Sequence, residues 1–328
     1  MSDPAQQGRP PRGRWIKFAG QLVILLLVGW GIWRTMGGAL VQLSEAGVRP
    51  TDLHPGWLAL SGFGYLAGLY PCGTFWYRVL RSMRQRPGRW AAIRAYFASQ
   101  PGKYVPGKVM VIVIRTALIR GPQVNSTLAA AATFVETLTM MSIGAAIGAV
   151  LMPLALDADW RLVAFALTSA VVVGIPTLPS VFRQVAKWTK LHRLHPEIDE
   201  SLADLHIAAL APGWLGIAAG WFAMGVSLWG ALHALPAATT SGGVVQELLL
   251  MTACAALSTV AGFASGLPGG LGAREWVVMA LVAPQFGGVA AVLSAVIHRG
   301  VMIVTELLAC VVVLLLMTRS NCVRRANG

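Results

Sequence analysis

The stretch VAAVLSAVIHRGVMIVTELLACVVVLLLM, residues 289–317, decides the fold class. It is 29 residues long, whereas a helix needs about 20 apolar residues to cross the hydrocarbon of a membrane. A strand of a membrane barrel needs only about 10 residues, with alternating polarity. Because lipid offers no water to backbone amides, an apolar run of this length can cross only as a helix. The sequence therefore predicts an all-α membrane protein.

Five further runs have the same character, and the composition agrees with them. They cover residues 16–36, 55–77, 127–152, 162–182 and 207–235. Of the whole chain, 56% is hydrophobic and 12% is charged, against about 25% charged in an ordinary soluble domain. This balance excludes a soluble enzyme, and we predict six full spans.

Two other apolar segments are interrupted by proline and glycine. Residues 90–119 contain the sequence PGKYVPGK at 101–108, and residues 244–283 contain LPGGLG at 267–272. Proline removes a helical hydrogen bond and glycine weakens a helix, so each segment should form two helices joined by a turn. We predict two re-entrant hairpins, and eight full spans remain an alternative. The turns would be shaped by Pro106, Gly107, Pro268, Gly269 and Gly270.

Basic residues gather in three regions of the chain. The 26 Lys and Arg residues exceed the 13 Asp and Glu residues, giving a net charge of +13. They concentrate in residues 1–17, 78–94 and 319–325, which the positive-inside rule assigns to the cytoplasm. The connections at 45–52, 153–160 and 236–243 contain Arg49 as their one basic residue and should face outward. We predict a multi-pass protein of the cell membrane with both termini in the cytoplasm.

The same pattern predicts the domain organisation. Residues 1–15 form a basic, disordered tail, residues 16–317 form one transmembrane domain, and residues 318–328 form a basic cytoplasmic tail. Pro106 precedes Glu136 by 30 residues, and Pro268 precedes Arg299 by 31. Paired broken helices in two halves are typical of inverted repeats with a binding site near the midplane.

Ionisable side chains inside apolar segments are costly and indicate function by default. Here they are Lys103, Lys108, Arg115, Glu136, Arg274, Glu275, Arg299 and Glu306. Single residues could form structural pairs, such as Glu136 with a lysine or Arg299 with Glu275. As a set they contain five cations and three anions. The surplus, together with the helix ends at the two turns, would suit a phosphate or a phospholipid head group.

Motifs of catalysis and of metal or cofactor binding are missing from the sequence. The cysteines at 72, 254, 310 and 322 show no CxxC spacing, and no nucleotide-binding loop, GxSxG or HExxH motif occurs. We therefore expect no enzyme activity, no metal and no cofactor. The arginines at 78–94 are tethered to spans, so they should contact anionic lipid rather than nucleic acid.

The PGK motifs of residues 101–108, Arg115 and the small-residue helix leading to Glu136 resemble the lysylphosphatidylglycerol synthase transmembrane region family. The block PGGLGARE at 268–275 and the last span, from His298 to Glu306, continue the resemblance. The resemblance implies a flippase-like membrane domain acting on phospholipid or polyprenyl-phosphate-linked head groups. Because only eleven residues follow Met317, we expect no aminoacyl-transferase domain.

Three functions are consistent with these features. The first is a flippase-like transporter with a polar intramembrane groove. The second is a membrane scaffold that presents lipid to a partner glycosyltransferase or lipid synthase without moving it. An intramembrane transferase is the third, but no pair of nucleophile and base supports it.

Overall fold

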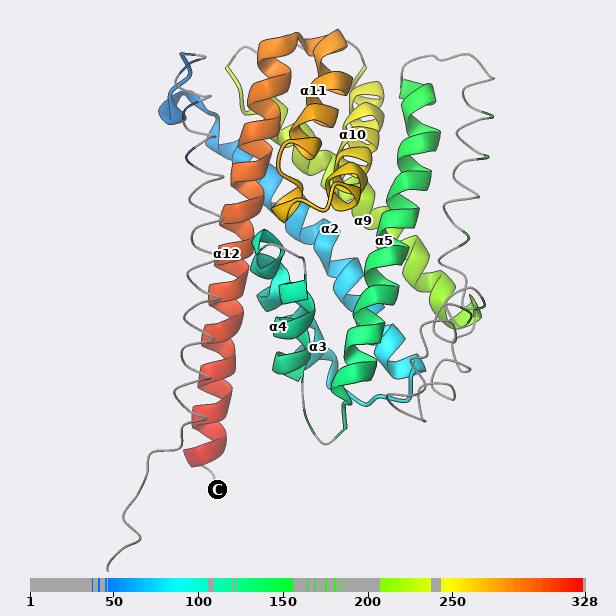
Figure 1. Cartoon of the computed structure of the whole chain (residues 1–328). Coiled ribbons are helices and arrows are strands. Elements are labelled where there is room, and N and C mark those ends of the chain that lie inside the picture. The colour runs from blue at the N-terminus through cyan, green and yellow to red at the C-terminus, as the bar shows by residue number, and fades with distance from the viewer. Residues whose placement is uncertain are drawn as a thin grey trace, which may run out of the picture.

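The computed structural model is all-helical in the parts of the chain that it describes (Figure 1). These parts are residues 47–105, 109–119, 121, 123–155, 207–236 and 243–326, with isolated positions at 37, 41, 45, 164, 168, 175, 180 and 184. The predicted span at 16–36, all but four isolated positions of the predicted span at 162–182, the turn residues Pro106 and Gly107, and the candidate site residue Lys108 lie outside them.

Eight α-helices and three short 3-10 helices make up the described structure. The first half holds η1 (Pro50–Asp52), α2 (Pro55–Ser82), α3 (Arg89–Ser99), η2 (Gln100–Tyr104), α4 (Val109–Ile119) and α5 (Ser126–Ala155). The second half holds α9 (Ile207–His233), α10 (Val244–Ala264), η5 (Pro268–Gly270), α11 (Ala273–Phe286) and α12 (Gly288–Ala326).

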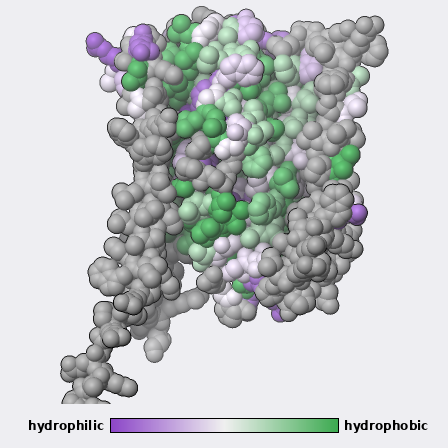
Figure 2. Space-filling view, in the orientation of Figure 1, coloured by the Kyte–Doolittle hydropathy of each residue, from purple (hydrophilic) through white to green (hydrophobic). Residues whose placement is uncertain are grey.

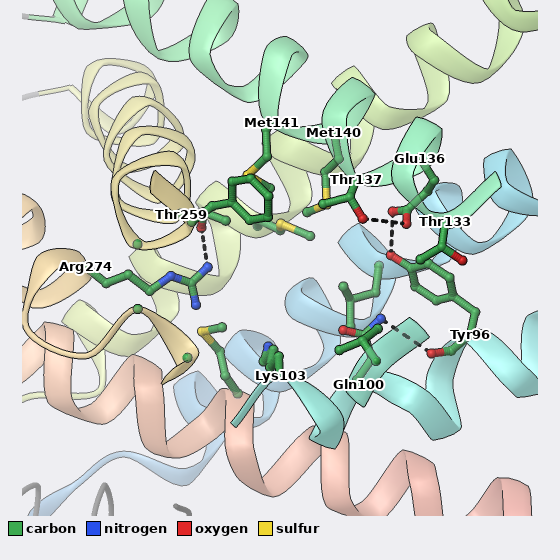
Figure 3. A pocket seen from close by; sticks show the side chains of 18 of the residues that line it. Tyr96, Gln100, Lys103, Thr133, Glu136, Thr137, Met140, Met141, Thr259 and Arg274 are labelled. Atoms are coloured by element: carbon green, nitrogen blue, oxygen red, sulfur yellow. Dashed lines mark hydrogen bonds between the residues drawn. The ribbon is translucent and has the colours of Figure 1, made fainter. Parts of the chain in front are cut away.

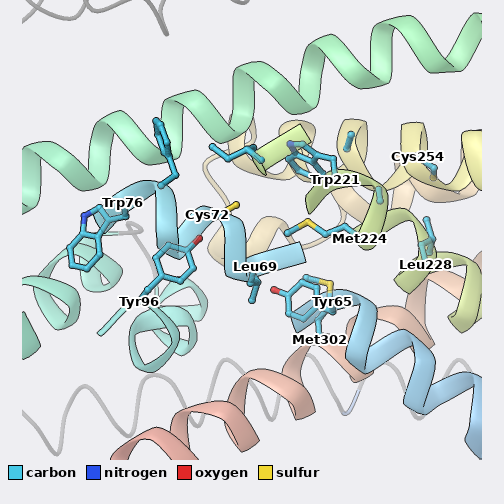
Figure 4. Close-up of a cluster of buried hydrophobic side chains, with 14 of the residues drawn as sticks. Tyr65, Leu69, Cys72, Trp76, Tyr96, Trp221, Met224, Leu228, Cys254 and Met302 are labelled. Carbon is cyan, nitrogen blue, oxygen red and sulfur yellow. The ribbon is translucent and has the colours of Figure 1, made fainter. Parts of the chain in front are cut away.

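Helices α2 and α9 cross the back of the bundle and pack closely against each other (Figure 1). Their contact is built on glycine, because a Cβ atom at Gly68 would lie 2.8 Å from the Gly220 carbonyl oxygen. A Cβ atom at Gly64 would lie 2.9 Å from the carbonyl oxygen of Ala223. Such small-residue contacts let two membrane helices approach backbone to backbone. Around them lies the apolar core, which includes Trp221 and Met224 (Figure 4).

Each predicted broken segment forms two helices joined by a turn. The first hairpin is α3, η2 and α4, and the second is α10, η5 and α11. The hairpins approach from opposite ends of the bundle, and their turns meet near its middle (Figure 1). At this meeting point a Cβ atom on Gly269 would lie 3.0 Å from the Tyr104 ring.

The turn of the second hairpin needs glycine for its backbone. Gly269 has φ 58° and Gly270 has φ 71°, a left-handed conformation that glycine adopts without the steric cost of a Cβ atom. At Gly272 (φ 81°) the chain enters α11, and the Glu275 carboxylate accepts a hydrogen bond from the Gly272 amide at 2.7 Å. Glu275, in the first turn of α11, thus caps the amino end of this helix, as the acid of a capping box does.

Four of the described helices are long and apolar enough to cross a membrane, by length and composition. They are Ser126–Ala155, Leu210–His233, Val244–Ala264 and Gly288–Leu316, and three of them match predicted full spans. The predicted span at 55–77 forms the 28-residue helix α2, which is not one of the four. Helix α2 contains five glycines and several hydroxyl-bearing side chains, which make it less hydrophobic than those four helices.

Candidate functional site

A cavity of about 290 Å³ lies between α5 and the two hairpin turns (Figure 3). Its walls are mostly apolar, with polar groups from seven of the described α-helices and from η2. The lining residues include Tyr65, Tyr96, Gln100, Lys103, Val109, Arg115, Phe134, Glu136, Thr137, Met140, Met141, Thr259, Phe263, Arg274 and His298. A mostly apolar pocket with a few convergent polar groups is the usual form of a ligand site.

The cavity reaches the surface between α4, α5 and α10. Three apolar lining residues at this opening, Val109, Phe134 and Phe263, are 60%, 54% and 39% exposed. The described part of the face turned toward the viewer is itself largely apolar (Figure 2). In a protein that lies in a membrane, such an opening faces the acyl chains of lipid.

Arg115 and Glu136 form a buried ion pair deep in the cavity wall. The Arg115 guanidinium donates to the Glu136 carboxylate at 2.8 Å, and each side chain is 3% exposed. Tyr96 donates to the other carboxylate oxygen at 3.1 Å, and its ring lies 4.2 Å from the Arg115 guanidinium carbon. Glu136 is therefore paired with Arg115 and not with Lys103, one of the two lysines considered from the sequence; the other, Lys108, lies outside the described residues. Arg115 is placed opposite Glu136 because α4 packs against α5.

Lys103 lies on the first hairpin turn and contacts two other elements. Its ammonium group forms an ion pair with Glu306 of α12 and donates to the Tyr65 hydroxyl of α2 at 2.9 Å. Tyr65 also donates to Glu306. The Glu306 side chain is 1% exposed, whereas Lys103 is 22% exposed. This cluster fastens the first turn to α12 while leaving Lys103 at the cavity wall.

Arg299 and Glu275 form the ion pair that the sequence suggested. Arg299 also donates to the Gly269 carbonyl oxygen at 3.0 Å, which fixes the second turn to α12. These side chains stand behind the turn. Arg299, Glu275 and Glu306 do not themselves line the cavity.

Arg274 enters the cavity from the first turn of α11. Its guanidinium donates to the Thr259 hydroxyl at 2.6 Å (Figure 3). In the described part of the chain, no carboxylate lies within ion-pair distance of it. It is thus a cation held at the wall by a neutral partner.

Several residues of the site were missed by the sequence reasoning. Tyr65, Tyr96 and Thr259 hold the charged groups in place, and a tyrosine in the middle of an apolar run was a usable signal for the first two. His298, which lines the cavity from α12, has its Nε2 atom 3.1 Å from the Ser227 hydroxyl oxygen. Among the described residues, no group of three potential metal ligands occurs.

Comparison with known protein families gives a match over most of the chain. The family model of the lysylphosphatidylglycerol synthase TM region matches residues 18–310. The chain belongs to this family. As a member of the lysylphosphatidylglycerol synthase TM region family with several long apolar helices, it is a multi-pass membrane protein. No curated protein matches the chain.

Proposed function

We propose that this protein is a flippase-like lipid transporter without enzymatic activity, and that the cavity holds the head group of an anionic lipid. The substrate would be a phospholipid or a polyprenyl-phosphate-linked lipid of the cell membrane. The observation that carries the proposal is a cavity with cationic walls that opens sideways through an apolar rim.

The shape of the site suits a molecule with two chemically different ends. Lys103 and Arg274 lie at the inner wall, whereas Phe134 stands at the opening. A phosphate could bind the cations through charge-assisted hydrogen bonds. The acyl or prenyl chains could pass the rim and stay in the bilayer. The apolar part of the lipid would then remain in contact with other lipids while the head group occupies the cavity.

The two hairpins give the proposal a route across the membrane. We infer that both are re-entrant, one entered from each side, with their turns near the midplane as in transporters built from inverted repeats. Irregular backbone is tolerated at that depth where protein or a water-filled cavity covers it. Movement of the turns past each other would open the cavity to either side alternately. Both termini would lie in the cytoplasm.

Reconstitution into liposomes tests this function. Labelled phosphatidylglycerol and a labelled polyprenyl-phosphate hexose would be followed between leaflets for wild type and Thr137→Trp, which places an indole in the cavity. Leu138→Trp is the matched control, because Leu138 does not line the cavity. We expect exchange by wild type and by the control, and its loss in Thr137→Trp.

Other outcomes decide against transport. Equal exchange by both tryptophan variants would rule out the cavity as the route. Cavity-dependent binding without any exchange would instead favour the scaffold that presents lipid to a partner glycosyltransferase or lipid synthase.

A further inference from the structure

The charges around the cavity do not cancel. Three ion pairs account for most of the described ionisable side chains there, namely Lys103 with Glu306, Arg115 with Glu136, and Arg299 with Glu275. Among the described residues, Arg274 remains as a cation whose hydrogen-bond partner is the hydroxyl group of Thr259. The remaining titratable group with a basic form, His298, is hydrogen-bonded to Ser227. Together with Glu306, Glu275 and Arg299, which lie behind the wall, the described ionisable side chains of the cavity therefore carry one net positive charge, with His298 neutral.

The position of Arg274 is built into the backbone around it. Its side-chain stem lies against two glycines, Gly262 on the first arm of the second hairpin and Gly270 in the turn. A Cβ atom on Gly262 would lie 2.5 Å from Cγ of Arg274, and one on Gly270 would lie 3.1 Å from the same atom. Gly262 and Gly270 also lie so close that a Cβ atom on Gly270 would be 2.7 Å from the Gly262 Cα atom. Side chains at these positions would push the guanidinium out of its place.

The guanidinium group is available to a ligand. One of its nitrogens bonds Thr259, and the group stands at the cavity wall (Figure 3). A guanidinium offers five N–H donors in a planar fork that matches the oxygens of a phosphate. Lys103 lines the same cavity, but its charge is already balanced by Glu306.

We propose that the cavity selects lipids whose head group carries one net negative charge, and that Arg274 binds their phosphate. The chemical class is a phosphodiester without a cationic substituent, which includes phosphatidylglycerol and polyprenyl-phosphate sugars. This inference rests on the proposed function. It adds the net charge of the head group and identifies Arg274 as the residue that binds its phosphate.

Electrostatics inside a largely apolar site explains the selection. Uncompensated charge is costly where the effective dielectric constant is low. A phosphomonoester brings about −1.5 to −2 charges at pH 7 and would leave the site negative. Lysylphosphatidylglycerol brings two amino groups beside its phosphate, and no free carboxylate among the described cavity residues would meet them.

Native mass spectrometry of the full chain in detergent tests the proposal. The protein would be titrated at pH 8 with phosphatidylglycerol, a polyprenyl-phosphate hexose, phosphatidate and lysylphosphatidylglycerol. We expect at least one of the first two lipids to bind about tenfold more tightly than either of the last two. Comparison of these two arms identifies whether the phosphodiester comes from a glycerolipid or a polyprenyl lipid.

Variants distinguish a specific contact of Arg274 with the lipid from an effect of the overall positive charge of the protein. Arg274→Gln should lose about tenfold in affinity for the preferred lipid, while Arg274→Lys should lose less. Arg49→Gln removes an equal charge at an exposed position and should bind as wild type. If Arg274→Gln does not fold, the proposal is still tested by the lipid selectivity of the wild type and by the lipid affinity of Arg274→Lys.

Two results would overturn the inference while sparing the proposed function. One is phosphatidate or lysylphosphatidylglycerol binding as tightly as the phosphodiester monoanions, with binding still abolished by Thr137→Trp. The other is unchanged affinity in a folded Arg274→Gln. If wild type binds none of the four lipids, or if Thr137→Trp binds them normally, the proposed function fails as well.

Discussion

The two hairpins have the same connectivity and opposite charge arrangements. In the first, Arg115 on the second arm pairs with Glu136 on the following long helix, and in the second, Glu275 pairs with Arg299. The first pair is 3% exposed on both sides, whereas Arg299 and Glu275 are 9% and 23% exposed. The first pair is also enclosed by the Tyr96 and Trp76 rings.

This difference assigns separate tasks to the two halves. In the first hairpin, both described charges at the cavity, Lys103 and Arg115, are matched by carboxylates. The second hairpin keeps a looser pair and adds Arg274, which no described carboxylate neutralises. These arrangements suit a site in which the first hairpin stabilises the structure and the second hairpin, through Arg274, binds the ligand.

The largest expected effect is at the sealed pair. Glu136→Gln leaves the Arg115 guanidinium buried without a counter-charge, which should cost about 3–5 kcal/mol of folding free energy. Thermal melting and size-exclusion profiles of the purified protein would show it. Combining Arg115→Met with Glu136→Gln should restore most of the stability. A melting temperature of Glu136→Gln equal to that of the wild type would contradict a structural role for this pair.

A smaller loss is expected at the corresponding pair of the second half. Glu275→Gln keeps an acceptor for the Gly272 amide but removes the charge opposite Arg299, and a hydrogen bond to a charged group contributes about 1.5–3 kcal/mol. The same melting measurement, in the same detergent, gives the comparison directly. A loss equal to or larger than that of Glu136→Gln would reverse the assignment of the two halves.

Gly262→Ala sharpens the comparison without changing any charge. The added methyl group would collide with the Arg274 stem, so phosphodiester affinity should fall about tenfold, or 1.4 kcal/mol. Gly300→Ala, whose methyl group would meet nothing within 4 Å, is the control and should bind normally. Unchanged binding by Gly262→Ala, in titrations followed by native mass spectrometry, would show that the guanidinium position is not critical.

The smallest effect is expected at the partner of Arg274. Thr259→Val removes the hydroxyl that holds the guanidinium but leaves its charge, so lipid affinity should fall about threefold. Thr116→Val is matched to it, because the Thr116 hydroxyl bonds only within its own helix, to carbonyl oxygens of α4. The same titration would measure both, and equal affinities in the two variants would contradict an anchoring role of Thr259.

The fold class and the broken helices could be read from the chain because they depend on local chemistry. Apolar length alone predicts the helices that cover 127–152 and 289–317, and proline and glycine predict both turns. The pairing of Arg299 with Glu275 was anticipated as one option. The partner of Glu136 was not, since three candidate cations, Lys103, Lys108 and Arg115, precede it by 21 to 33 residues and only the packing of α4 on α5 selects Arg115.

The sequence by itself determined that this protein lies in a membrane, that it is helical, and that charged side chains would meet inside it. Those properties follow from hydrophobicity and backbone hydrogen bonding, which act over a few turns of helix. Only the tertiary structure decided which charges cancel and that Arg274 is left over. Ion pairing is a matter of distance in space, and the hairpins bring together residues as far apart as Lys103 and Glu306, which no local pattern records.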